Sequence, residues 1–212
     1  MEEKKIPQSV LKRLPGYLAY LKSMPEDAAP NISATALANA LGMGEVQVRK
    51  DLAMVTDGGR PKIGYNRENL IDDIEQFLGY GNTTDAVLIG AGKLGQALMG
   101  YSGFDEYGLN ILAAFDVDPK MEKTDEGKRI YPISRLVSFC RSHKVLMGII
   151  TVPAEAAQEV ADLLIQGGIK AIWNFAPTHL EVPRSILVQN ENMATSLAVL
   201  SMHLQAQMKD KK

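Results

Sequence analysis

The sequence predicts an α/β protein in which a small helical domain precedes a doubly wound parallel sheet. Two observations support this class. From residue 86 onward, strand-like apolar runs alternate with helix-like segments, which is the pattern of parallel strands covered by helices on both faces. Before residue 80, apolar residues recur at helical spacing, and glycines and prolines separate short segments. We therefore expect domains at 1–80 and 81–191 and a terminal helix at 192–212.

Composition and charge limit the function. The 212 residues are 46% hydrophobic and 23% charged, as in an ordinary globular protein, with no apolar run of 18 residues and no signal-peptide pattern. We therefore expect a cytoplasmic protein without a membrane partner. Cys140 is the single cysteine and is expected in the core, and three dispersed histidines predict no metal site. Residues 1–70 hold ten Lys/Arg and eight Asp/Glu, hence +2, a sign that suits a polyanion-binding module.

The first domain carries the pattern of a helix-turn-helix. Pro7 is placed to open a helix that continues past Pro15 on an apolar stripe, and Ser33 is placed to cap a short second helix. Gly42-Met-Gly44 ends that helix, and a third helix follows from about Glu45 to Val55. Two short helices joined by a tight glycine-containing turn predict a helix-turn-helix.

The helix at 45–55 has the composition of a recognition helix. On a helical wheel, Val48, Leu52 and Val55 face inward, which leaves basic and amide side chains outside. Arg and Lys can contact phosphates or guanine, and Gln can read adenine. The segment 56–65 then predicts a β-hairpin wing. The DNA-binding candidates are Ser33, Gln47, Arg49, Lys50, Arg60 and Lys62. A helical hairpin with a solvated charged face is the alternative interpretation.

An amphipathic helix at 68–78 closes the first domain, and the alternating segments of the second domain follow. We expect strands at 86–90, 110–115, 145–151, 170–174 and 186–189, and helices at 93–101, 134–142 and 154–166.

A glycine-rich loop between the first strand and its helix is the most informative motif of the chain. Residues 85–98 contain Gly-x-Gly-x-x-Gly after an apolar strand and before a helix, which is the context of a nucleotide site. Gly90 would permit the tight turn, Gly92 would let the backbone approach a pyrophosphate at the helix N-terminus, and Gly95 would let helix and strand pack closely. The candidate contacts in this loop are Gly90, Ala91, Gly92, Lys93, Leu94 and Gly95.

An acid follows the loop at the expected distance. The second strand ends in Asp116, 21 residues past Gly95, where a carboxylate receives the adenosine ribose hydroxyls and favours NAD over NADP. The motif leaves two alternatives open. The site could belong to a relative of this fold that holds coenzyme A or another adenine nucleotide, or it could be degenerate and bind nothing.

Two later strands end at the same edge of the sheet, where the carboxyl ends of parallel strands border the ligand crevice. Thr151, Val152 and Pro153 follow one strand and are expected along the middle of the cofactor. Asn174 and Phe175 follow the next strand and are expected near the nicotinamide end. Plain core packing is the alternative for Phe175.

The last segment is apolar on more than one face. From about Asn192, apolar residues repeat at spacings of 4, 3, 4 and 4, and these residues are Met193, Leu197, Leu200, Leu204 and Met208. Further apolar residues widen this stripe beyond one face, which predicts docking against a partner subunit. A helix folded back onto its own domain is the alternative.

Several motifs occur together and in the order seen in one family. They are Ile6-Pro7, Arg13-Leu-Pro15, Gln47-x-Arg49-Lys-Asp-Leu52, Gly64-Tyr65, Gly90-Ala-Gly-x-Leu-Gly95, Phe115-Asp-Val-Asp-Pro119, Val152-Pro-Ala154, Ala157-Gln158 and Asn174-Phe-Ala-Pro177. With them the chain resembles, nearly end to end, the bacterial Rex family of redox-sensing transcriptional repressors. The resemblance implies a homodimer with a winged-helix domain, an NAD(H)-binding Rossmann domain and a C-terminal helix exchanged between subunits. It also implies operator binding that NADH abolishes and NAD+ permits or favours.

The resemblance assigns roles to three residues. It implies that Arg13 and Tyr101 link the DNA-binding domain, the nicotinamide pocket and the partner subunit. It also implies that Phe175 contacts the nicotinamide region.

Three features depart from the family's pattern. Asn174 stands where some relatives have a carboxylate, and Lys93 replaces a usual asparagine. The wing at 54–65 lacks two aromatics and two glycines, which leaves its conformation and the operator sequence open.

Two functions from different classes follow from these observations. A non-enzymatic sensor needs only a ligand with different affinities for two states, here with discrimination around Tyr101, 151–153 and Phe175. An NAD-dependent oxidoreductase with an N-terminal helical dimerisation module needs a general acid or base near the nicotinamide. His143 precedes its strand at the opposite sheet edge, and His179 lacks an obvious carboxylate partner. We therefore predict a regulator and not an enzyme, with NAD+/NADH and double-stranded operator DNA as its ligands.

Overall fold

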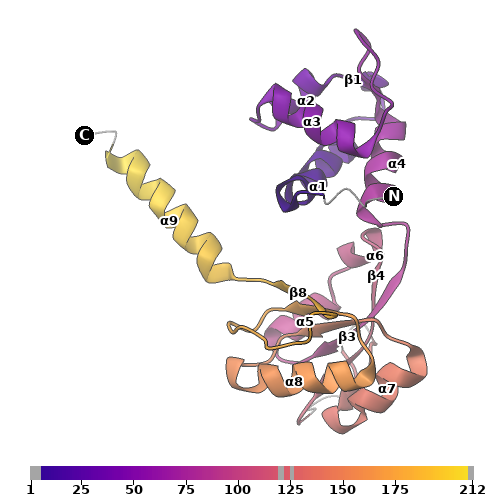
Figure 1. Ribbon diagram of the computed structural model, residues 1–212, viewed down its shortest axis with the longest axis vertical. Coiled ribbons are helices and arrows are strands. Elements are labelled where there is room, and N and C mark those ends of the chain that lie inside the picture. The colour runs from indigo at the N-terminus through magenta and orange to yellow at the C-terminus, as the bar shows by residue number, and fades with distance from the viewer. Residues whose placement is uncertain (1–5, 119–121, 125–126, 210–212) are drawn as a thin grey trace. The chain divides into compact units, whose positions relative to one another are not determined.

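The chain divides into two compact units, residues 1–82 and 83–212, in a computed structural model that describes residues 6–118, 122–124 and 127–209 (Figure 1). The boundary expected at 80/81 lies two residues before this division. No helix among the described residues is long and apolar enough to cross a membrane.

From residue 6 onward, where the structure describes it, the first unit is built from four helices and one pair of very short strands. The helices are α1 Gln8–Ser23, α2 Ala34–Ala40, α3 Glu45–Val55 and α4 Arg67–Leu78. The helix expected at 45–55 is present with those bounds, and Gly42 makes the preceding turn with φ of 64°. The core of this unit contains Leu14, Tyr17, Leu37, Val48, Leu52 and Ile74, all fully buried.

The wing differs from the expected hairpin. Strand β1 (Asn31–Ile32), which precedes α2, pairs antiparallel with β2 (Tyr65–Asn66). Within 56–65 the strand-like pairing is a single bridge between Arg60 and Gly64, closed by a turn in which Lys62 has φ of 67°. The prediction of a hairpin is therefore correct only at its tip, because Tyr65, the last residue of the expected hairpin, pairs with Ile32 of β1 instead.

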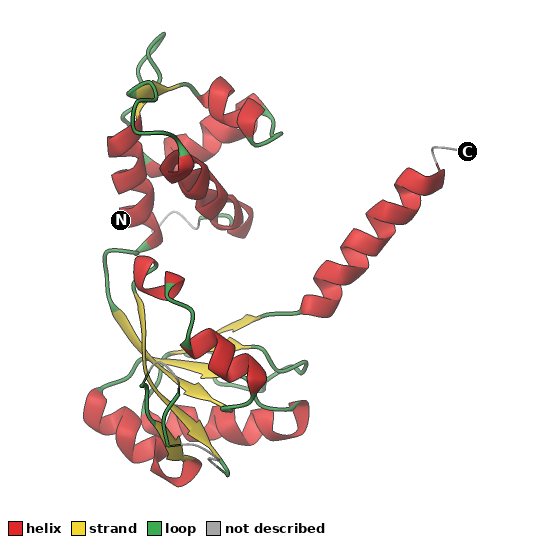
Figure 2. Cartoon of the chain, turned by 180° about the vertical axis from the view of Figure 1, so that it is seen from behind, coloured by secondary structure: helices red, strands yellow, loops and turns green. Residues whose placement is uncertain are grey.

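The second unit contains a six-stranded parallel sheet in the order β5-β4-β3-β6-β7-β8 (Figure 2). Its strands are β3 Thr84–Ile89, β4 Leu109–Asp116, β5 Ile130–Pro132, β6 Met147–Ile150, β7 Ala171–Asn174 and β8 Leu187–Asn190. The chain enters the sheet in its middle at β3 and adds β4 and β5 toward one edge. It then returns to the middle at β6 and adds β7 and β8 toward the other edge. This order confirms the predicted doubly wound sheet.

Helices cover both faces of the sheet. One face carries α7 (Leu136–His143) and α8 (Ala154–Gly167) over a core that includes Val87, Ile89, Phe115, Cys140 and Val160. The other carries α5 (Lys93–Met99) and α6 (Gly103–Glu106) over Ala86, Leu88, Met99 and Ile149. Cys140 lies in the core, as expected.

Three elements of the second unit depart from the sequence-based expectations. The helix expected at 93–101 ends at Met99, because Gly100 terminates it, and α6 follows as a separate turn. Strand β5 was not expected, since three residues carry too little periodicity to identify. A 3₁₀ turn, Ile133–Arg135, leads into α7.

The C-terminal helix α9 spans Met193–Lys209, close to the expected start at 192. Asn192 caps it, since its side-chain oxygen accepts a hydrogen bond from the backbone N–H of Thr195 at 3.1 Å. Every side chain from Ala194 to Lys209 is exposed. This agrees with a helix that lacks a cover within its own unit and does not support the alternative of folding back.

Candidate functional site

The glycine-rich loop has the backbone that each glycine was expected to provide. Gly90 has φ of 102°, and a Cβ there would lie 3.0 Å from the Thr151 backbone. A Cβ on Gly95 would lie only 2.0 Å from the Gly90 carbonyl oxygen, so only glycine permits this contact between helix and strand. A Cβ on Gly92 would meet nothing within 4 Å. The open space at Gly92 is where a ligand could approach the backbone.

Thr151 supports this loop from the neighbouring strand. Its hydroxyl lies 2.8 Å from the Gly90 carbonyl oxygen and 3.0 Å from that of Ile89, and its backbone N–H donates to Ile89 at 2.9 Å. Thr151 therefore shapes the loop, and its expected place along the cofactor stays a prediction. Val152 is half-buried and Pro153 is exposed beside it.

Asp116 lies directly against the loop. Its Oδ2 accepts a hydrogen bond from the backbone N–H of Ala91 at 2.7 Å, and its Oδ1 accepts one from Asp118 at 3.1 Å. The carboxylate is half-exposed. A carboxylate has about four acceptor positions, so two hydrogen bonds leave capacity for ribose hydroxyls.

The start of α5 faces outward from the loop. Gly92 occupies the N-cap position and offers no side-chain cap, and Lys93 and Leu94 are exposed at the first positions of the helix. Gln96 donates to the Ala91 carbonyl oxygen at 2.8 Å, which ties the loop to the helix. Lys93 therefore adds an exposed positive charge next to the open space at Gly92.

A row of four aromatic rings connects Tyr101 with Phe175. Tyr101 contacts Phe104 edge-on with ring centroids 4.9 Å apart, Phe104 contacts Trp173 at 5.7 Å, and Trp173 contacts Phe175 at 4.8 Å. The indole N–H of Trp173 donates to Glu191 at 2.9 Å. Tyr101 is 53% exposed, whereas Phe175 is half-buried against the sheet. The row places both residues that the resemblance assigned to the nicotinamide region in one aromatic group.

Sequence reasoning missed Phe104 and Trp173, the two inner members of this row. The available signal was their type, because the chain has few aromatic residues and only one tryptophan. Gly103 also belongs to this group, since a Cβ there would lie 2.5 Å from the Tyr101 ring.

Asn174 does not present its side chain to the crevice. It is fully buried, and its amide nitrogen donates to the carbonyl oxygen of Thr178 at 3.0 Å and to Asn190 at 2.9 Å. Its oxygen accepts from the Ala176 N–H at 3.0 Å. In this structure the Asn174 side chain shapes the loop that carries Phe175, and its expected place near the nicotinamide end stays a prediction.

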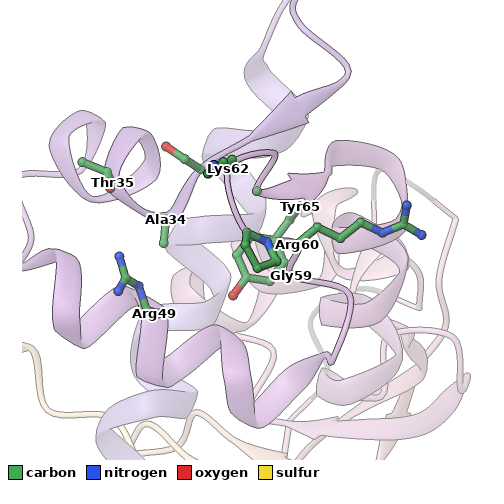
Figure 3. A pocket seen from close by; sticks show the side chains of 10 residues that line it. Ala34, Thr35, Arg49, Gly59, Arg60, Lys62 and Tyr65 are labelled. Atoms are coloured by element: carbon green, nitrogen blue, oxygen red, sulfur yellow. The ribbon is translucent and has the colours of Figure 1, made fainter.

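In the first unit, a hollow of about 530 Å³ opens between the start of α2, helix α3 and the wing (Figure 3). The residues that line it are Ser33, Ala34, Thr35, Arg49, Gly59, Arg60, Pro61, Lys62, Gly64 and Tyr65. Four of the six DNA-binding candidates are among them. In Figure 3 the side chain of Arg49 extends from α3 toward α2, below Ala34 and Thr35.

The predicted DNA-binding side chains are exposed, and some of them already interact with other residues of the chain. The Ser33 hydroxyl caps α2 by accepting from the Ala36 N–H at 3.0 Å, and Arg49 forms an ion pair with Glu45 one turn earlier on α3. Lys50, Arg60 and Lys62 are exposed. Lys50 lies outside the hollow, on the remaining outer surface of α3.

Helix α3 is attached to α1 by an ion pair between the half-buried Arg13 and the buried Asp51, which sequence reasoning did not identify. Arg13 donates from Nε and Nη2 to the two carboxylate oxygens of Asp51, at 2.7 and 2.8 Å. The Tyr17 hydroxyl donates to the same carboxylate at 2.7 Å. The available signal was position, because Asp51 lies three residues after Val48 on the inward face of the helix. Arg13 was expected to link domains, and that role remains a prediction.

This cluster shifts the pKa of each member. Burial acts to raise the pKa of Asp51, but hydrogen bonds from Arg13 and Tyr17 and the Arg13 charge outweigh it, so the pKa lies below its ordinary value. Burial, followed by the hydrogen bond to Asp51, raises the pKa of Tyr17 to about 12. The pKa of Arg13 is raised, chiefly by its hydrogen bonds to Asp51. Asp51 is therefore ionised and Tyr17 neutral at physiological pH.

No group of three or more potential metal ligands occurs within the described parts of the chain. A winged helix-turn-helix unit with a cation-lined hollow, joined to a sheet with a dinucleotide-type loop, defines a class of protein: a DNA-binding regulator with a nucleotide-sensing domain.

The comparisons with known proteins agree with this class and narrow it. A family model described as "CoA binding domain" matches residues 81–178, and one described as "Putative DNA-binding protein N-terminus" matches residues 5–53. The chain is 41% identical over 197 residues to the redox-sensing transcriptional repressor Rex of Porphyromonas gingivalis, which covers 92% of this chain and 90% of that protein. The chain therefore belongs to the Rex family of redox-sensing transcriptional repressors.

Two solved structures are similar over nearly the whole chain. The structure of RSP in complex with beta-NAD+ and operator DNA has a TM-score of 0.89 and 32% identity, covering 99% of this chain and 97% of that one. The structure of RSP in complex with beta-NADH has a TM-score of 0.88 and 31% identity, covering 99% of each chain. The description of the family model at 81–178 matches the coenzyme A alternative, whereas the full-length relatives are redox-sensing repressors.

Proposed function

We propose that this protein is a cytoplasmic transcriptional repressor that binds operator DNA as a homodimer and senses the ratio of NADH to NAD+. In this proposal NAD+ permits DNA binding and NADH releases the protein. The observation that carries it is the similarity, over 99% of this chain, to a protein solved with both beta-NAD+ and operator DNA. A protein that acts in this way needs no catalytic residue, because binding energy alone shifts the equilibrium between two states.

The proposed cofactor site is the edge of the sheet around Gly92, Asp116, Thr151 and Phe175. The pyrophosphate would lie at the uncapped start of α5, where backbone N–H groups and Lys93 offer positive charge. Asp116 would accept the ribose hydroxyls while it keeps its bond to Ala91. These assignments follow the loop's geometry and the position of the acid.

The proposed discrimination between the two cofactors lies at the aromatic row. The two forms differ at the nicotinamide ring, which is neutral in NADH and cationic in NAD+. An apolar site lined by Phe175 and its neighbours admits a neutral ring without the desolvation cost that a cation suffers. NADH should therefore bind more tightly, and that difference in affinity is what a switch requires.

Mobility shifts on DNA from the promoter region of the protein's own gene test the proposal, with NAD+ and NADH titrated separately. We expect a specific complex that NADH dissolves and NAD+ does not. Phe175→Ala should make the affinities for NADH and NAD+ more similar, so that release of the DNA requires more NADH. A parent protein that ignores the ratio of the two would contradict redox sensing, and superimposable curves for parent and variant would exclude Phe175 as the discriminator.

The proposed DNA contacts are the outer face of α3 and the wing. Lys50→Ala should weaken DNA binding and leave NADH affinity intact, because Lys50 is exposed in the first unit and the proposed cofactor site lies in the second. If Lys50 contacts a phosphate, the slope of log affinity against log salt should fall by about one. Unchanged operator affinity at matched salt would remove Lys50 from the interface.

A further inference from the structure

The Arg13 guanidinium contacts an exposed side chain of the recognition helix as well as the buried Asp51. The amide of Gln47 lies 3.1 Å from Arg13 Nε and 3.0 Å from Nη1. Because a guanidinium carries only N–H donors, the amide atom that faces it is assigned as the oxygen. The single N–H of Nε donates to Asp51, so Gln47 Oε1 accepts one full hydrogen bond from Arg13, from Nη1, and the amide nitrogen faces away.

The orientation of Gln47 determines what it can read in DNA. The amide oxygen faces Arg13 and accepts from it, which directs the two N–H donors of the NH₂ group away from the guanidinium. Glutamine reads adenine with both ends of its amide, accepting from the N6 amino group and donating to N7. That pairing requires the oxygen that Arg13 already holds. Guanine presents two neighbouring acceptors, O6 and N7, in the major groove and so matches an amide that directs its N–H donors outward.

Arg13 is itself held in place by buried groups. Asp51 is 3% exposed and engages Nε and Nη2 of the guanidinium, while the fully buried Tyr17 donates to Asp51 from behind. Rotation of Arg13 away from Gln47 would break two charge-assisted hydrogen bonds in a buried site, which is costly. The orientation of an exposed amide is thus determined by buried residues on two helices.

We propose that Arg13, positioned by Asp51 and Tyr17, holds the amide of Gln47 with its oxygen inward, so that Gln47 selects guanine and not adenine in the operator. This inference rests on the proposed function, because it requires that α3 enters the major groove. Gln47 is then the specificity-determining residue, and Arg13 and Asp51 are positioning residues. The proposal differs from the general expectation that a glutamine on such a helix can read adenine.

Selection from a pool of duplex DNA with a random core, in the presence of NAD+, tests the role of Gln47. We expect Gln47→Ala to relax the preference at one base pair of each half-site, by about fivefold or more, and that pair should be G·C. Replacement of its guanine by 7-deazaguanine, which lacks the N7 acceptor, should weaken binding of the parent but not of the variant. An A·T pair at that position would overturn the proposal, as would an equal loss of affinity on every sequence.

The positioning role has its own test. Arg13→Lys replaces the planar fork of fixed donors with one mobile ammonium group, so it should no longer fix the amide and should admit adenine at that base pair. Tyr17→Phe removes one hydrogen bond with little change in packing and should shift the preference in the same direction by less. Glu75→Gln is the matched control, because it breaks an ion pair between α1 and α4 (Lys22 Nζ to Glu75 Oε1, 2.6 Å) and leaves α3 untouched.

The outcomes separate this inference from the proposed function. If the parent selects no sequence from the pool, the proposed function fails. If the parent selects a sequence, but Arg13→Lys only lowers the melting temperature and leaves the base preference unchanged, the cluster is merely structural and this inference fails alone. A changed preference in Arg13→Lys with an unchanged one in Glu75→Gln supports the inference.

Discussion

Asp51 is a carboxylate that the fold buries and ionises at the same time. Burial alone would favour its protonated form, but two hydrogen bonds from Arg13 and one from Tyr17 stabilise the charge. The folded-state pKa therefore lies below the unfolded one. It follows that the stability contributed by ionised Asp51 is complete above about pH 4 and is lost as the pH falls through the folded-state pKa.

Asp51→Asn should therefore lower the free energy of unfolding of the first unit at neutral pH, by about 3–5 kcal/mol, because it leaves Arg13 without its buried partner. The difference from the parent should shrink below about pH 4, where Asp51 of the unfolded parent chain begins to be protonated while the folded form still holds it ionised. Urea unfolding at several pH values measures both effects. A difference that is constant from neutral to acidic pH would show that ionisation of Asp51 contributes nothing.

Asp116 combines two tasks at one residue, since it holds the Ala91 N–H and is the proposed ribose acceptor. Asp116→Ala should weaken binding of NADH by about 1–3 kcal/mol, the cost of hydroxyl groups left unpaired. Asp116→Asn is the informative companion, because its amide oxygen can still accept from Ala91 while the negative charge that repels a 2′-phosphate is gone. Calorimetry with NADH and NADPH measures the affinities of both variants. We expect Asp116→Asn to reduce the difference between the affinities for NADH and NADPH. Unchanged affinities in both variants would show that Asp116 is not the ribose ligand.

At the scale of elements, the glycines of the loop have two different roles. Gly90 and Gly95 are required by the packing of the fold, whereas Gly92 leaves space for the proposed ligand. Gly95→Ala places a methyl group against the Gly90 carbonyl oxygen, so we expect a loss of stability of about 1–3 kcal/mol or more. Gly92→Ala meets open space at φ of −72°, so the melting temperature should hardly change. The added methyl should instead weaken NADH binding, by roughly the 1.5–3 kcal/mol of one hydrogen bond to a charged group.

Thermal melts and NADH titrations of the two variants distinguish these effects. The expected pattern is a stability defect for Gly95→Ala and a binding defect without a stability defect for Gly92→Ala. Full NADH affinity in Gly92→Ala would place the pyrophosphate elsewhere.

At the scale of the whole molecule, α9 exposes apolar side chains that a partner subunit is expected to cover. Its large apolar side chains are exposed by 49–69%, namely Leu197, Val199, Leu200, Met202, Leu204 and Met208. An exposed apolar surface of this kind marks an interface. Deletion of residues 192–212 should therefore convert a dimer into monomers or aggregates, which light scattering measures. A soluble dimer without these residues would exclude α9 from the subunit interface.

Several features of this protein could be predicted from the sequence because they depend on residues close together in the chain. The glycine pattern at 90–95 predicts its own backbone, since the positive φ of Gly90 and the close contact of Gly95 with the Gly90 carbonyl oxygen involve only neighbouring residues, and the helix at 45–55 follows from its apolar periodicity. The same holds for the parallel sheet, because alternating strands and helices leave few other arrangements. The family motifs extended these local signals to a function.

Other features were decided only by the tertiary structure, because they join residues that are far apart in the chain. Arg13 and Asp51 are 38 residues apart, and no local pattern indicates which cation a buried carboxylate will meet. The pairing of β1 with β2, the aromatic row from Tyr101 to Phe175 and the inward turn of Asn174 likewise arise from packing between separate elements. The sequence by itself determined the fold class and the types of side chain available at each site. The tertiary structure decided which of these side chains interact, because burial and geometry select one partner among several residues of the same chemical type.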